Sequence, residues 1–316
     1  MGGDMKTRKL GRSGLDVSIT GIGCNNFGGR LDKEGTRAVI YRAIDLGVTL
    51  FDTADMYGDR GGSETIMGEL LGARRKDIVL ASKFGMAMDD SGRKQGGSRR
   101  YIIEAVEASL TRLRTDWIDL YQIHRPDPST PIEETLRALD DLVRHGKVRY
   151  IGCSNFAGWQ LTEALWTSRL GGLESFVSCQ NEYSLVERGV EAELVPAMAQ
   201  YGVGLLPFYP LAAGLLTGKY AGGAAPAGAR LTRFPKMAGR HLSERNRAIA
   251  DKLDAYAKER GRSLLELSMS WLAMQPRVSS VIAGASSPEQ VEANAKAVGW
   301  AMSAHELQQI NEITRG

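Results

Sequence analysis

The stretch Ile78-Val79-Leu80-Ala81-Ser82-Lys83 shows the pattern on which the fold depends: four apolar residues in succession, then a polar end. Uninterrupted apolar character, without alternation between apolar and polar residues, is typical of a strand covered on both faces, as in a parallel sheet. Residues 203–206 have the same character. We therefore expect parallel strands that are covered by helices.

Runs of this kind recur along the chain and alternate with helical segments. Residues 37–46, 101–113 and 133–143 have the periodicity of amphipathic helices. The runs begin near Ser18, Val48, Asp77, Trp117, Val148, Phe176, Val203 and Val278, roughly thirty to forty residues apart except for one wide gap before the last. Eight strand–helix units are typical of a (β/α)8 barrel or of a long doubly wound sheet.

Two features favour closure into a barrel. Gly11-Arg12-Ser13-Gly14 separates two extended stretches within residues 6–22 and predicts a β-hairpin over the bottom of the barrel. The wide gap begins with a Gly/Ala/Pro-rich stretch, 214–239, expected to be a mobile loop on the active-site face, and continues with helices over 244–259 and 264–274. Because no Pro/Ser-rich linker divides the chain, we predict one TIM barrel domain over residues 1–316, with an N-terminal hairpin and extra helices.

The composition favours a small-molecule enzyme in the cytoplasm. The formal net charge is +3 for 316 residues and no basic stripe is present, which argues against a nucleic-acid partner. No apolar run reaches about 18 residues, and the start of the chain is polar and basic, unlike a signal peptide or a membrane span. Cys24, Cys153 and Cys179 have neither disulfide nor zinc spacing, so we expect reduced thiols and no metal.

Motifs of other nucleotide-binding folds are incomplete. The stretch Gly21-Ile22-Gly23-Cys24-Asn25-Asn26 lacks the third glycine of the dinucleotide fingerprint. Residues 214–220 are one residue short of a P-loop, and Tyr220 replaces its Ser or Thr. A Rossmann oxidoreductase and a P-loop nucleotidase are therefore both disfavoured.

Polar residues interrupt the apolar runs at five successive strand ends. They are Asp52 and Tyr57 after the second run, Lys83 after the third, His124 after the fourth, Ser154 and Asn155 after the fifth, and Gln180 after the sixth. In a parallel β/α barrel the carboxyl ends of the strands converge on the active site. We expect these side chains to line one pocket.

Four of these residues can share the work of reducing a carbonyl. Tyr57 would donate the proton to the developing alkoxide, and the Lys83 ammonium would lower the pKa of that phenol. Asp52 would keep Lys83 charged, and neutral His124 would donate a hydrogen bond to the substrate oxygen. Taken singly, each has a structural explanation, such as a helix cap for Asp52 or a surface lysine for Lys83, but their placement at consecutive strand ends favours the catalytic one.

The sequence resembles the aldo-keto reductase superfamily over nearly its whole length. The matching motifs are Asp52-Thr53-Ala54 with Tyr57, Gly62-Ser63-Glu64, Lys83, His124-Arg125-Pro126-Asp127 and the fifth-strand stretch 146–156. Residues 210–220 are most similar to the bacterial sugar-oxidoreductase and potassium-channel β-subunit branches. The resemblance implies a (β/α)8 barrel that binds a nicotinamide cofactor without a Rossmann domain.

The same resemblance implies roles for individual residues. Asp52, Tyr57, Lys83 and His124 match the catalytic tetrad. The positions that match cofactor-binding residues are Ser154, Asn155 and Gln180 for the carboxamide, Phe208 for stacking on the nicotinamide, Tyr209, Leu211, Gly214, Thr217 and Lys219 for the pyrophosphate, and Gly284, Ser286, Gln290 and Asn294 for the adenosine end. NADPH is the favoured cofactor. NADH is the alternative, because the segment around Ser286 carries no cation for a 2′-phosphate and Ala293 replaces the family's usual glutamate.

Three functions are compatible with these residues. The leading hypothesis is NAD(P)H-dependent reduction of an aldehyde or ketone, including sugar-derived carbonyls, by hydride transfer. The alternatives are an NAD-dependent aldose or alcohol dehydrogenase, and a cofactor-sensing regulatory subunit, which the complete catalytic set disfavours. Phe27 and Arg125 are candidates for substrate contact, although Arg125 has salt-bridging to Asp127 as an equal alternative. The sequence is also compatible with an oligomer.

Overall fold

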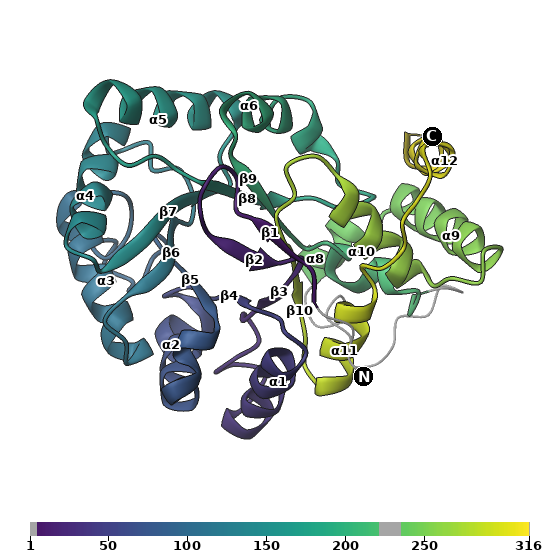
Figure 1. Cartoon of the computed structure of the whole chain (residues 1–316), viewed down its shortest axis with the longest axis horizontal. Coiled ribbons are helices and arrows are strands. Elements are labelled where there is room, and N and C mark those ends of the chain that lie inside the picture. The colour runs from purple at the N-terminus through teal and green to yellow at the C-terminus, as the bar shows by residue number, and fades with distance from the viewer. Residues whose placement is uncertain (1–4, 221–234, 316) are drawn as a thin grey trace.

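Eight parallel strands form the centre of the molecule (Figure 1). The computed structural model describes residues 5–220 and 235–315. In their order around the barrel the strands are β10 (Val281–Gly284), β3 (Thr20–Gly23), β4 (Leu50–Asp52), β5 (Val79–Phe84), β6 (Ile118–Ile123), β7 (Val148–Ser154), β8 (Ser178–Glu182) and β9 (Gly204–Phe208). The barrel closes between β9 and β10, where the Leu205 N–H donates to Arg277 O at 2.7 Å and the Ser279 N–H to Leu205 O at 2.9 Å. The predicted (β/α)8 barrel is confirmed.

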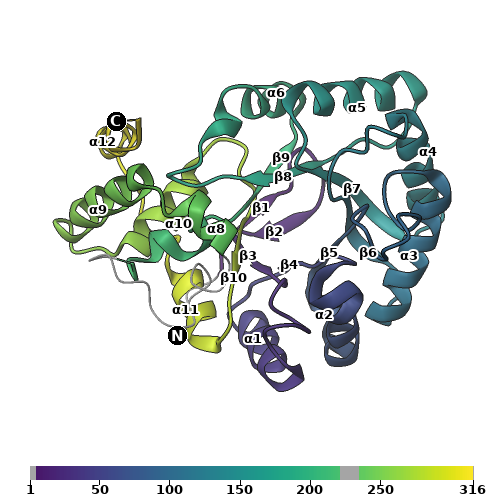
Figure 2. The same ribbon diagram turned by 180° about the vertical axis from the view of Figure 1, so that it is seen from behind.

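Helices surround the barrel in both views (Figures 1 and 2). The outer ring comprises α1 (Lys33–Asp45), α2 (Tyr57–Leu71), α3 (Arg99–Leu113), α4 (Ile132–Arg144), α5 (Gly158–Gly171), α6 (Leu194–Tyr201), α10 (Leu264–Met274) and α11 (Pro288–Lys296). The extra helices are α8 (Pro235–His241), α9 (Glu244–Lys258) and α12 (Ala304–Arg315), and short 3₁₀ turns occur at η1 (Gly72–Asp77), η2 (Gly189–Glu191) and η3 (Ala212–Thr217). Serine caps fix several helix starts. At α10, for example, Ser263 and Glu266 form a capping box, which satisfies backbone donors that the helix leaves free.

The N-terminal hairpin lies across the bottom of the barrel, as predicted. β1 (Thr7–Lys9) pairs antiparallel with β2 (Asp16–Ser18), and Figure 1 shows the pair over the middle of the strands. Leu10 and Val17 are fully buried in a cluster with Leu50, Ala81, Leu120, Leu206 and Ile282 from five barrel strands. Burying such side chains contributes about 1.5–3 kcal/mol each, so the hairpin acts as a plug that stabilises the closed end.

The predicted loop after β9 is only partly described. Its start forms η3, and its last residues belong to α8. Residues 221–234, which make up most of the segment expected to be mobile, lie outside the described part of the chain.

Candidate active site

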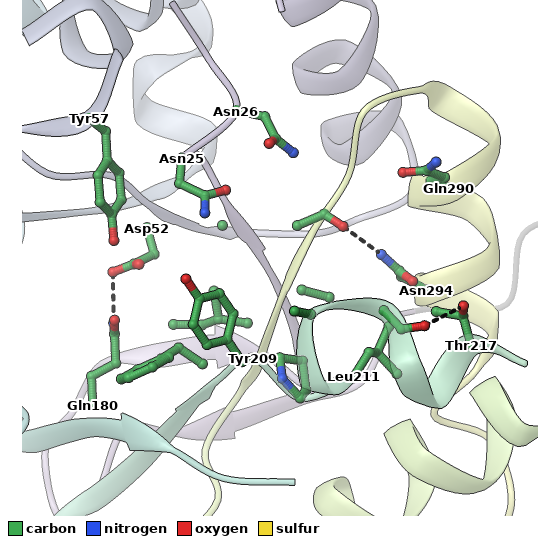
Figure 3. A pocket seen from close by; sticks show the side chains of 18 of the residues that line it. Asn25, Asn26, Asp52, Tyr57, Gln180, Tyr209, Leu211, Thr217, Gln290 and Asn294 are labelled. Atoms are coloured by element: carbon green, nitrogen blue, oxygen red, sulfur yellow. Dashed lines mark hydrogen bonds between the residues drawn. The ribbon is translucent and has the colours of Figure 1, made fainter. Parts of the chain in front are cut away.

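One cavity of about 510 Å³ opens at the carboxyl ends of the strands. It extends from Tyr57, Asp52 and Gln180 at one end to Gln290 and Asn294 at the other (Figure 3). Its volume is within the usual range for a small-molecule site. Polar side chains from separate strand ends therefore line one cavity, as the sequence predicts.

A buried ion pair forms the base of the catalytic end. Lys83 Nζ donates to Asp52 Oδ2 at 2.6 Å and to Thr53 O at 3.0 Å, and the lysine has no exposed surface. The other carboxylate oxygen, Oδ1, accepts from Gln180 Nε2 at 2.8 Å and from Gln122 Nε2 at 3.2 Å. A buried pair is tolerated when each charge also has hydrogen-bond partners, and here both have them. Burial alone would lower the pKa of Lys83, but Asp52 and Tyr57 together raise it, so the ammonium stays charged.

Tyr57 lies directly above this pair, at the start of α2. Its hydroxyl oxygen accepts from Lys83 Nζ at 3.3 Å, and its ring meets the His124 ring edge-on at 5.8 Å. Burial raises the pKa of Tyr57, and the Lys83 charge only partly opposes this rise. The predicted lowering by Lys83 is present, but burial outweighs it, because the cost of charging a buried phenol exceeds the gain from the ammonium. The phenol is protonated at neutral pH.

The backbone after Tyr57 is held in an unusual conformation. Four successive residues, Gly58, Asp59, Arg60 and Gly61, have positive φ angles of 68°, 59°, 63° and 119°. A Cβ on Gly58 would lie 2.6 Å from Phe27 O, so the turn packs closely on the loop after β3. Non-glycine residues in this region cost about 1 kcal/mol each, and such strain is common at functional sites. The turn fixes where the Tyr57 side chain enters the cavity.

His124 follows β6 and is uncharged. Burial, followed by the charges of Lys83 and Arg125, lowers the pKa of His124 to about 3. Its Nδ1 atom is buried and has no hydrogen-bond partner among the described residues. A neutral imidazole in this position can donate a hydrogen bond without repelling Lys83.

Hydrogen bonds join the ends of β7 and β8 to each other and to His124. Ser154 Oγ donates to Gln180 O at 2.8 Å, and Asn155 Nδ2 donates to His124 O at 2.9 Å and to Ser154 Oγ at 3.0 Å. Asn155 has a φ of +61°, a region in which asparagine is among the favoured non-glycine residues. These bonds place an array of amide and hydroxyl groups next to the Asp52–Lys83 pair.

The remaining length of the cavity is lined by the loop after β9 and by the start of α11. The Tyr209 ring meets Phe208 edge-on at 5.3 Å and lies on the wall in Figure 3, beside Leu211. Gly214 has a φ of +106°, a conformation that favours glycine, and the position of its missing Cβ is 2.8 Å from Lys219 Nζ, so this amine packs against the Gly214 backbone. Thr217 Oγ1 donates to Gly214 O at 2.8 Å.

At the far end the hydrogen bonds are between neutral groups. Gln290 Oε1 accepts from the Ser286 N–H at 2.9 Å and from Ser286 Oγ at 3.1 Å, and Asn294 Nδ2 donates to Gly284 O at 3.5 Å. Gly284, Gln290 and Asn294 line the cavity. Ser286 does not line it and acts on it only through Gln290.

The sequence-predicted residues divide into three groups. Asp52, Tyr57, His124 and every proposed cofactor residue except Ser286 line the cavity, while Lys83 lies behind Asp52. Phe27 is fully buried in the hydrophobic core and does not line the cavity, so its expected contact with substrate is not supported by its position. Arg125 is exposed at the end of β6 and is outside the cavity lining.

Four residues with polar side chains near the site were missed in the sequence. Gln122 was one of them, although a signal was present: it shares the inward face of β6 with Leu120 and His124, and is the only amide in that strand. Asn25, Asn26 and Arg30, which follow β3, line the cavity. Nothing in their spacing distinguishes them from ordinary loop residues.

The lining residues fit a nicotinamide dinucleotide. Amide and hydroxyl groups at Ser154, Asn155 and Gln180 suit a carboxamide, and the ring of Phe208, which also lines the cavity, suits the flat ring beside it. The amine of Lys219 packed over Gly214 suits a pyrophosphate in the middle of the cavity.

Within the described residues, no group of His, Cys, Asp and Glu side chains is placed to hold a metal ion. No helix in this part of the chain has the length and apolar character needed to cross a membrane.

Fold and site together place the chain among the (β/α)8 oxidoreductases. It belongs to the aldo/keto reductase family, whose profile matches residues 20–315.

Relatives with assigned names fall into the branches suggested by the sequence. The chain is 40% identical to a "Probable voltage-gated potassium channel subunit beta" of Oryza sativa subsp. japonica over 93% of this chain and 91% of that protein. It is 36% identical to the "L-glyceraldehyde 3-phosphate reductase" of Escherichia coli (strain K12), over 98% and 92%. An "Uncharacterized oxidoreductase" of Bacillus subtilis (strain 168) is also 36% identical, over 99% and 97%.

Proposed function

We propose that this protein reduces an aldehyde or ketone to an alcohol with NADPH, and that Tyr57 is the general acid. The observation that carries the proposal is Lys83 Nζ, which contacts Asp52 Oδ2 at 2.6 Å and the Tyr57 hydroxyl at 3.3 Å, two groups that line the same cavity. The phosphorylated substrate named for the Escherichia coli relative makes sugar-derived carbonyls a natural first class to test.

The residues divide the reaction between them. A bound nicotinamide cofactor supplies the hydride. Tyr57, protonated at neutral pH, gives its proton to the oxygen that gains negative charge, and Lys83 stabilises the phenolate that remains. Asp52 holds Lys83 charged, and neutral His124 donates a hydrogen bond that keeps the carbonyl oxygen next to the phenol.

NADPH is the proposed cofactor, with NADH as the alternative. Sites specific for NADH often place a carboxylate on the adenosine ribose, where it would repel a 2′-phosphate. Asp52 is the only carboxylate among the described lining residues, and it lies at the opposite end of the cavity. Initial rates with both cofactors, in both directions and with aldehydes, ketoses and aldoses, test this preference and the alternative of an NAD-dependent dehydrogenase.

The role of Tyr57 is tested by Tyr57→Phe. We expect turnover to fall by about 10²–10⁴-fold, as for the loss of a general acid, while NADPH binding measured by fluorescence quenching stays within about twofold. Tyr41→Phe is a matched control, because that hydroxyl donates to Leu70 O at 3.1 Å on the barrel exterior. Equal loss of binding and turnover would contradict the assigned role.

A cofactor-sensing regulatory subunit is the second candidate, favoured by the likeness to the potassium channel β-subunits. Tight NADPH binding without turnover of any carbonyl would support it. We further propose that residues 1–316 form one domain and act in the cytoplasm, in keeping with three buried, free cysteines.

A further inference from the structure

Gln122 is a fully buried amide on the inward face of β6. Its neighbours in the sheet are Lys83 on β5 and Gly152 on β7. Its side chain contacts Asp52, which lines the cavity, but Gln122 itself does not line it. The amide can therefore influence a bound molecule only through other residues.

The hydrogen-bonding capacity of this amide is only half used. Nε2 donates to Asp52 Oδ1 at 3.2 Å, but Oε1 is buried and has no partner among the described residues. An unpaired buried acceptor costs free energy. The preceding inward residue of the strand, Leu120, belongs to an apolar layer of the barrel interior. The fold alone would thus favour an apolar side chain at position 122, and the contact with Asp52 is what the amide adds.

The neighbouring position on β7 is a glycine, and it leaves room for the amide. The missing Cβ of Gly152 is 3.2 Å from Gln122 Cγ and 2.5 Å from Ser178 Oγ, so both side chains pack against the Gly152 backbone. Close packing restricts the rotamers that a buried side chain can adopt. The Gln122 amide is therefore held against Asp52.

Asp52 Oδ1 accepts from two glutamines that differ in their access to the cavity. Gln180 Nε2 donates at 2.8 Å, and Figure 3 shows this bond at the edge of the cavity, which Gln180 lines. A bound molecule can compete for the Gln180 amide. It cannot reach Gln122, which therefore remains the donor to Oδ1 whatever occupies the cavity.

A donor held on Oδ1 also fixes the direction of the second carboxylate oxygen. The carboxylate is planar and turns as a unit about one bond. Holding Oδ1 at Gln122 keeps Oδ2 at Lys83 Nζ, 2.6 Å away, and Lys83 Nζ lies 3.3 Å from the Tyr57 hydroxyl. The position of Lys83 beside Tyr57 thus depends on the rotation of Asp52, and through it on Gln122.

We infer that Gln122 is a positioning residue for the reduction: its amide holds Asp52 so that Lys83 stays on the Tyr57 hydroxyl when a cofactor engages Gln180. This inference rests on the proposed function and adds a residue to it. Because Gln122 contacts neither the reacting atoms nor the cavity, it supports proton transfer from Tyr57 and has no part in binding.

The test is Gln122→Met, which keeps an unbranched side chain of similar size and removes the donor. We expect kcat with NADPH and the best substrate of the carbonyl panel to fall about tenfold, as for the loss of a hydrogen bond to a charged group. KM, and the dissociation constant of adenosine 2′,5′-bisphosphate as a probe of the distant adenosine end, should stay within about twofold. An unchanged kcat, or equal weakening of all three, would overturn the inference, since equal weakening means that the whole cavity is disturbed.

A double variant separates positioning from a general loss of activity. If Gln122 acts through Tyr57, Gln122→Met should slow Tyr57→Phe by less than about twofold, because the proton transfer that it supports is already absent. Effects of the two changes that multiply would contradict this role.

Ser178→Ala is the matched control. The Ser178 hydroxyl is equally buried, packs against the same glycine and has no partner among the described residues, so its removal should leave kcat at the wild-type value. A loss equal to that in Gln122→Met would assign the effect to packing around Gly152 and exclude a role for the amide.

Failure of the proposed function is recognised separately. If no carbonyl is turned over, that function fails, and urea unfolding of the cofactor-free protein decides whether Gln122 holds Asp52. With either glutamine replaced, the other still donates to Oδ1. Gln122→Met/Gln180→Met should therefore raise the unfolding equilibrium constant at least about tenfold beyond the product of the two single effects. A double variant that equals this product refutes the inference.

Discussion

Replacing Lys83 by methionine removes the ammonium from the buried pair while keeping an unbranched side chain of similar length. At the 2.6 Å separation of Lys83 Nζ and Asp52 Oδ2, an effective dielectric constant of about 20 gives an attraction of about 6 kcal/mol. Desolvation of the two ions cancels much of this in the wild type. In the variant, Asp52 bears its desolvation cost with only the two glutamine amides as donors.

We therefore expect Lys83→Met to lose about 3–5 kcal/mol of unfolding free energy at pH 7, the usual cost of leaving one buried charge unpaired. In the wild type the pKa of Lys83 is raised above 10.5, so its contribution to the free energy of unfolding is full in the neutral range and is lost only as pH rises through that raised value.

Urea unfolding, followed by the fluorescence of the five tryptophans in the absence of cofactor, measures this effect. The matched variants are Asp52→Asn and the double variant Asp52→Asn/Lys83→Met, which removes both charges of this pair and should recover most of the loss. A cost below about 1 kcal/mol, or strict additivity in the double variant, would refute the reasoning.

Two further predictions concern ionisable groups around the pair. With a pKa of about 3, His124 should show no protonation between pH 5 and 8 in a nitrogen-detected NMR titration, and a midpoint near 6.5 would contradict its burial. Asp55, whose carboxylate accepts from Tyr101 OH at 3.4 Å, has its pKa raised to about 7 by burial and by the nearby Glu64 charge. The folded protein therefore binds a proton at Asp55 more tightly than the unfolded chain does, so the free energy of unfolding falls as pH rises from about 4 to 7. Asp55→Asn should add up to about 4 kcal/mol to the free energy of unfolding at pH 8.5 but little at pH 4. Urea unfolding at both pH values checks this, and an equal change at both would exclude the mechanism.

The barrel was predictable because its signal repeats locally. Most strands are short apolar runs followed by a helix of regular period, so eight successive units and the hairpin at Gly11 can be recognised without knowing how they pack. Convergence of Asp52, Tyr57, Lys83 and His124 on one cavity then follows from the parallel direction of the strands, which places every carboxyl end on the same face.

Contacts within the cavity were less predictable. Phe27 and Arg30 are three residues apart in a loop, and the sequence favoured the aromatic residue, yet Phe27 packs in the core while Arg30 lines the site. The turn after Tyr57 decides this, because its close approach to the loop sets which side chains face inward. Such an approach depends on residues distant in sequence and has no local period.

The sequence by itself determined the positions of the strands, the order of the catalytic residues and the absence of a Rossmann fingerprint, since these depend on local pattern and chain direction. Only the tertiary structure decided the protonation states of the site residues and their hydrogen-bond partners. Gln122 and Gln180 meet Asp52, Asp127 is occupied by Gly97 and its neighbours instead of Arg125, and burial outweighs Lys83 in setting the pKa of Tyr57. Desolvation and hydrogen bonding act through space, so they are fixed only when the barrel closes and brings these strand ends together.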